Sequence, residues 1–163
     1  MTAITTLTTI HWLLFLHIAS VLALLGTHGV SMVVLYGIRK ERDRDRIMAM
    51  VQLSGRTTIP MYVSTLAIVL FGSLLAFKEH LWGETWLWVS IGILVAVIAL
   101  MNVVAKPYFA KVKEACQLRP SGVPRISDEE LGDVLTSPRA HLITAIGVLG
   151  LLAILYLMIF KPF

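Results

Sequence analysis

The chain has 163 residues, of which 57% are hydrophobic and only 15% are charged, and its mean hydropathy is +0.81. A soluble domain is usually about a quarter charged, so the composition excludes an ordinary soluble protein. The net charge of +4 does not indicate nucleic acid as a partner, because the basic residues gather in two short segments beside apolar runs. We therefore predict a single membrane domain over residues 1–163 that contacts the lipid bilayer.

The first two predicted transmembrane spans cover residues 11–38 and 59–77. The first span contains no Asp, Glu, Lys or Arg, and a bilayer core needs only about 20 such apolar residues. Pro60 opens the second span, where a first helical turn tolerates its missing N–H. Both runs are long enough to cross a membrane as helices.

The third and fourth predicted spans cover residues 86–105 and 139–160. The pair Lys106 and Pro107 is expected to end the third helix, since proline lacks the N–H that a helix needs. Ser137 and Pro138 precede the fourth span as a cap residue followed by proline. The predicted fold is an all-α membrane protein, a bundle of four transmembrane helices.

The basic residues predict the orientation, because Lys and Arg near span ends are retained in the cytoplasm. Two connections are basic: residues 39–58, between the first two spans, and residues 106–138, between the last two. The middle connection contains a single Lys or Arg residue, Lys78. Both long loops should be cytoplasmic and both termini outside, in a multi-pass protein of a prokaryotic inner membrane. The residues counted are Arg39, Lys40, Arg42, Arg44, Arg46, Arg56, Lys106, Lys111, Lys113, Arg119, Arg125 and Arg139.

The long cytoplasmic loops are expected to carry short surface helices. Ser127 and Glu130 match the capping-box pattern that starts a helix. Cys116 is the single cysteine and is expected to be a free, reduced thiol. The sequence contains no Gly-rich phosphate loop, H-E-x-x-H, paired cysteines or G-x-S-x-G, so the motifs of common soluble enzymes are absent.

Small and hydroxyl residues predict where the helices touch, because lipid gives no hydrophobic drive for helix association. Each of the last three spans carries a stripe of such residues, and packing is the expected role of these stripes rather than a transport path. The stripes are Thr58, Tyr62, Thr65, Gly72, Ser73 and Ala76; Gly92, Ala96 and Ala99; and Thr144, Gly147 and Gly150.

The histidines are the candidate site residues. His17 and His28 are eleven residues apart, which places them on nearly the same helix face about 16 Å from each other, together with Ser20 and Ser31. An ionisable residue at this depth is a functional-site candidate by default. A neutral imidazole there could bind haem iron, a chlorin magnesium, copper or zinc, or could bond neighbouring helices.

Depth limits how these histidines could pair. His141 lies near the inner surface, about 10 Å below His28 by helical rise, so a haem held by both would need tilted or offset helices. A histidine paired with Met61 or Met101 is an alternative, although methionine in a helix is usually a packing residue. The cofactor-binding candidates are therefore His17, His28 and His141, and the metal candidates are His17 and His28.

The segment from Leu16 to Met32, LHIASVLALLGTHGVSM, resembles the first helix of a superfamily of small bacterial membrane proteins. That superfamily includes CopD-like copper-resistance domains, HemJ-like haem-binding oxidases and uncharacterised four-helix proteins. The shared feature is a Leu-His followed by glycine nine or ten residues later, matched here by His17 and Gly26. The resemblance implies that His17 is a haem ligand.

The sequence departs from the HemJ-like branch at the other residues that this branch expects. Leu24 and Leu25 stand near the position of its tryptophan, the first arginine is Arg39, and Lys106 lies only at the end of the third span. Haem b binding without that oxidase activity is compatible with the resemblance. The first hypothesis is a b-type haem or other tetrapyrrole redox protein, and the second is a non-catalytic accessory subunit of a respiratory or photosynthetic membrane complex. A third, copper or small-solute transport, needs a continuous polar path that these spans do not clearly provide. Whether the chain is an enzyme stays open.

Overall fold

The computed structural model describes residues 2–163, with side chains from Leu7 onward. In this part of the chain four segments are long and apolar enough to cross a membrane, which confirms the predicted all-α membrane bundle. The elements are α1 Thr2–Gly37, α2 Arg44–Arg56, α3 Thr58–Lys78, the short 3-10 helix η1 Leu81–Gly83, α4 Thr85–Ala115, α5 Asp128–Thr136 and α6 Arg139–Phe160.

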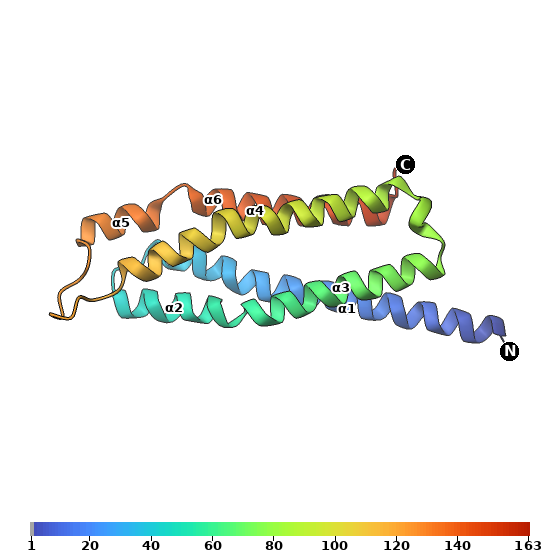
Figure 1. Ribbon diagram of the computed structural model, residues 1–163, viewed down its shortest axis with the longest axis horizontal. Coiled ribbons are helices and arrows are strands. Elements are labelled where there is room, and N and C mark those ends of the chain that lie inside the picture. The colour runs from blue at the N-terminus through green and yellow to red at the C-terminus, as the bar shows by residue number, and fades with distance from the viewer. Residues whose placement is uncertain (1) are drawn as a thin grey trace.

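The helices form two antiparallel pairs. α1 packs along α3, and α4 packs along α6, whereas contacts between the two pairs are few (Figure 1). The start of α1 and the end of α6 lie at one end of the bundle, and α2 and α5 lie at the other (Figure 1). The termini therefore share one side of the membrane, as the even number of spans requires.

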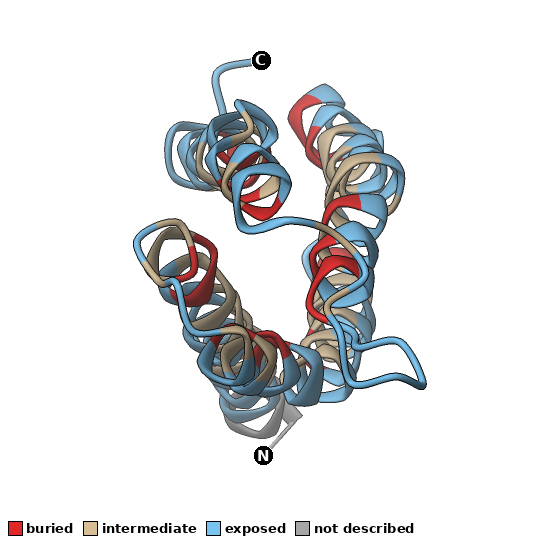
Figure 2. Ribbon diagram, turned by 90° about the vertical axis from the view of Figure 1, so that its left-hand side faces the viewer, coloured by how far each residue is buried: buried red, intermediate tan, exposed pale blue. Residues whose placement is uncertain are grey.

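Buried side chains are concentrated at the two ends of the bundle. At the end with α2 and α5, one cluster joins five helices through residues such as Leu35, Ile47, Val112, Leu135 and Ile143. A smaller cluster at the opposite end consists of Ala76, Trp86, Leu87 and Leu157. Buried positions lie mostly on the inner sides of the helices (Figure 2). The middle of the bundle is left less tightly packed.

The short helices α2 and α5 fix the end that we predict to be cytoplasmic. The capping box is confirmed: Ser127 N–H donates to Glu130 Oε2 at 2.9 Å, and Glu130 N–H donates to Ser127 Oγ at 3.2 Å. Arg44 donates to the carbonyl oxygens of Ala115 and Ile126 and forms an ion pair with Asp128 at 2.7 Å. These bonds tie the start of α2 to the end of α4 and the start of α5.

The expected end of the third helix at Lys106 and Pro107 is wrong. α4 continues through Pro107 to Ala115, ten residues beyond the predicted end of the span at Ala105. Proline removes one backbone hydrogen bond, and a helix packed against neighbours tolerates that loss. The continuation places Val112 and Ala115 in the large buried cluster, whose burial compensates for the missing bond.

Candidate functional site

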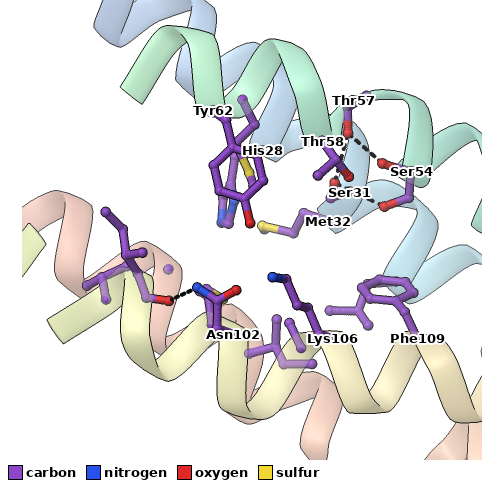
Figure 3. A pocket seen from close by; sticks show the side chains of 18 of the residues that line it. His28, Ser31, Met32, Ser54, Thr57, Thr58, Tyr62, Asn102, Lys106 and Phe109 are labelled. Atoms are coloured by element: carbon purple, nitrogen blue, oxygen red, sulfur yellow. Dashed lines mark hydrogen bonds between the residues drawn. The ribbon is translucent and has the colours of Figure 1, made fainter. Parts of the chain in front are cut away.

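A cavity of about 750 Å³ lies between the two helix pairs. Small-molecule sites usually occupy roughly 300–1,000 Å³. The wall is mainly apolar, with polar side chains contributed by α1, α3 and α4, among them His28, Tyr62, Asn102 and Lys106 (Figure 3). The cavity exists because the pairs are joined by buried clusters at their ends and by few contacts between them.

His28 brings an imidazole from α1 to this cavity. A Cβ atom added at Gly147 of α6 would lie 2.5 Å from His28 Nε2 and 3.0 Å from the Met101 methyl carbon. The absence of a side chain at Gly147 therefore allows α6 to approach the His28 ring. This agrees with the packing role predicted for the small residues of the fourth span. No hydrogen bond joins His28 to any other residue that the structure describes, and its Nε2 packs against the backbone of α6 at Gly147.

Three hydroxyl groups form a second polar feature of the cavity wall. Ser54 Oγ donates to Ser31 Oγ at 3.1 Å, and Ser31 Oγ lies 3.3 Å from Thr57 Oγ1. Thr57 Oγ1 in turn donates to the Ser54 carbonyl at 2.8 Å. The three hydroxyl groups connect α1 to the junction of α2 and α3 (Figure 3). Each of them has a hydrogen-bond partner within this group or at the Ser54 carbonyl.

Lys106 projects its ammonium group into the cavity from α4 (Figure 3). Arg56 and Lys113 also line the cavity. Lys106 has no ion pair and no hydrogen bond within the described chain. A positive side chain directed into a largely apolar cavity adds a binding feature for an anion.

His17 lies outside the cavity, on the interface between α1 and α3. Its Nδ1–H donates to the Ile68 carbonyl at 3.1 Å. A Cβ atom added at Gly72 would lie 3.0 Å from His17 Cε1, so the glycine makes room for the ring. The structure thus places His17 in an interhelical hydrogen bond, one of the two roles that its depth predicted.

His141 is exposed and lies at the start of α6. One of its ring nitrogens, Nδ1, is 3.4 Å from the Tyr36 hydroxyl of α1. The centroids of the Tyr36 and His141 rings are 5.9 Å apart. The structure does not bring His17, His28 and His141 together. Within residues 2–163 there is no group of three His, Cys, Asp or Glu side chains that could hold a metal ion.

The sequence did not predict that Lys106 lines a cavity. Asn102, Lys106 and Lys113 are spaced by four and seven residues and therefore share one face of a continuous helix. That pattern was hidden because Pro107 was expected to end the helix. The hydroxyl pairing of Ser54 and Thr57 with Ser31 was missed as well, since nothing in the sequence says which face of α1 meets the start of α3.

Cys116 is buried directly after α4, and burial raises the pKa of its thiol, an effect partly offset by the nearby positive charge of Arg44. A thiol with a raised pKa is unreactive, because the thiolate is the nucleophile. The residue is free, as predicted. Cys116 is therefore a packing residue in the large buried cluster.

Comparison with known proteins identifies the family of the chain. No curated protein and no solved structure matches the sequence. A family model described as predicted integral membrane protein (DUF2269) matches residues 11–162. This match spans all four apolar helical segments and the cavity between them. The chain is a membrane-spanning member of the DUF2269 family of integral membrane proteins.

Proposed function

We propose that the protein binds a b-type haem, or a closely related tetrapyrrole, in the cavity between its helix pairs. The observation that carries this proposal is the position of His28, whose imidazole lines a largely apolar cavity of about 750 Å³ and has no described protein partner. Imidazole is a common axial ligand of haem iron. The resemblance of the segment from Leu16 to Met32 to haem-binding membrane proteins favours haem as the ligand, but it implies His17 as the ligating residue, whereas this proposal assigns that role to His28.

Two side chains of the cavity wall are potential ligands of such a group. His28 would hold it through an imidazole nitrogen, and the Met101 side chain of α4 reaches the same point beside Gly147. Methionine paired with histidine is an established axial set for haem. His28 belongs to one helix pair and Met101 to the other, so a ligand held between them would bridge the two halves of the bundle.

In this proposal the chain has three tasks. A bound haem would supply one-electron chemistry. His28 would hold the group, the apolar wall would limit its contact with water, and Gly147 allows α6 to pack against the imidazole. His17 is assigned the interhelical bond to Ile68 rather than ligation.

The proposal is tested by titrating haem into the purified protein in mild detergent and recording the visible spectrum. The wild-type protein and the variants His17→Ala and His141→Ala should give the spectrum of a ligated haem, and His28→Ala should not. His141→Ala is the matched control, because it removes an exposed histidine outside the cavity. A ligated spectrum that survives in His28→Ala, or no binding by the wild type, contradicts the proposal.

A second candidate is an accessory subunit of a larger membrane complex. The observation that favours it is the scarcity of contacts between the two helix pairs, since contacts with another subunit would help to hold the two halves of the bundle together. Extraction in mild detergent should then yield the chain together with stoichiometric membrane partners. Recovery of the chain alone, with haem bound, would decide for the first proposal.

A further inference from the structure

The cavity is amphipathic, and its charge is of one sign. Three basic residues, Arg56, Lys106 and Lys113, line it, and no Asp or Glu from the described chain does. The ion pairs found among the described residues involve Arg44 and Arg46. Arg56, Lys106 and Lys113 therefore have no acidic partner among the described residues, and all three are exposed.

These charges lie toward the predicted cytoplasmic end. Lys106 follows Met101, which marks the level of His28, by five residues, or about 7.5 Å along the helix, and Lys113 is about 10 Å further. Arg56 ends α2, on the opposite helix pair. The other end of the cavity is lined by apolar or small residues, such as Leu94, Val97, Gly150 and Ile154.

A ligand that matches this wall has an apolar body and an acidic end. Positive side chains within a membrane are costly unless they find a negative partner or reach the interface. Figure 3 shows the Lys106 ammonium directed into the cavity rather than away from it. An ammonium and a guanidinium that line one cavity suit a carboxylate or a phosphate, which both accept several charge-assisted hydrogen bonds.

We infer that the end of the cavity formed by Lys106, Arg56 and Lys113 is a binding site for the acidic group of an amphiphile. Lys106 is the residue that contacts the acid, and Arg56 and Lys113 add positive charge at the mouth. This inference rests on the proposed function in using the same cavity, and it adds the recognition of carboxylate. For haem the acidic groups are the propionates; for a membrane lipid the acidic group is the phosphate.

The experiment compares haem with its dimethyl ester, which has the same macrocycle and no carboxylates. The proteins are the wild type, Lys106→Met and, as a matched control, Lys111→Met, which removes a charge from the same helix outside this cavity. The wild type and Lys111→Met should bind haem about tenfold more tightly than the ester, the lower range for a charge-assisted hydrogen bond. Lys106→Met should lose this preference and keep the spectrum of the ligated haem. Equal affinity of the wild type for the two compounds, or a preference that survives in Lys106→Met, overturns the inference.

A second measurement separates this inference from the haem proposal and shows that the variant is folded. Thermal unfolding of the three proteins is followed in detergent with added phosphatidylglycerol or phosphatidylcholine, and all three should have cooperative transitions. If the wild type binds no haem, stabilisation by phosphatidylglycerol that is specific to the anionic lipid and lost only in Lys106→Met supports an acid site for lipid. If the wild type binds no haem and shows no such lipid effect either, the inference is overturned. Arg56→Gln is the second variant if Lys106→Met does not fold, and it should reduce the same preference.

Discussion

The contact between His17 and Gly72 gives a prediction whose size follows from the structure. In Gly72→Ala, the new methyl group would lie 3.0 Å from His17 Cε1 and 3.1 Å from Nδ1, whereas carbon atoms in good contact are about 3.5–4.0 Å apart. The ring must move by several tenths of an ångström. Its 3.1 Å bond to the Ile68 carbonyl would then exceed the usual limit of about 3.2 Å.

The expected loss is that of one interhelical hydrogen bond. Such bonds contribute about 0.6 kcal/mol on average and up to about 1.7 kcal/mol in membrane bundles, so Gly72→Ala and His17→Ala should each destabilise the bundle by about 1 kcal/mol. In a protein that already carries His17→Ala, the added methyl meets no ring. Gly72→Ala should there be neutral, which gives a coupling free energy of about 1 kcal/mol.

The assay is reversible unfolding in mixed micelles with increasing dodecyl sulfate, followed by helical circular dichroism. Gly26→Ala is the matched control, because a Cβ atom at Gly26 has no neighbour within 4 Å. The change in stability that it causes should be the same with and without His17. Equal destabilisation by Gly72→Ala in both backgrounds would contradict this prediction, since it would place the steric conflict somewhere other than the histidine.

Three further predictions follow from packing, burial and charge. Gly150→Leu should destabilise the bundle by about 1–3 kcal/mol in the same unfolding assay, the usual range for overpacking, because Val97 already occupies the space of a Cβ atom; an unchanged midpoint would contradict this. Cys116 should react slowly with maleimide at neutral pH in the folded protein and quickly after denaturation, because burial raises the pKa of its thiol; equal rates would contradict this. In a Cys116→Ser background, an impermeant thiol reagent added to intact cells should label a cysteine at Gly83 but not one at Arg46 or Arg125; the opposite pattern would invert the predicted topology.

The four spans could be predicted because a bilayer imposes a simple length and polarity rule on each of them. Local signals were also reliable where the partners are close in sequence, as in the capping box of Ser127 and Glu130. The end of α4 was not predictable from Pro107, because the residues that stabilise its continuation, such as Leu131 and Leu135, belong to a helix far along the chain.

The histidines show the limit of helical spacing as a guide. An interval of eleven residues placed His17 and His28 on one face of α1, and yet they meet different neighbours. His17 packs against α3, whereas His28 packs against α6. Spacing predicts the direction of a side chain, and the helix that it meets depends on how the bundle packs at that level.

The proposed role of His28 is to bind a cofactor in the cavity. The most direct measurement is the reduced-minus-oxidised absorption spectrum of the protein as purified from its native membrane in mild detergent, compared with His28→Ala prepared in the same way. We expect a haem difference spectrum for the wild type and none for His28→Ala, with equal helical circular dichroism. A wild-type protein without absorption beyond its aromatic side chains, or a haem spectrum unchanged in His28→Ala, would contradict it.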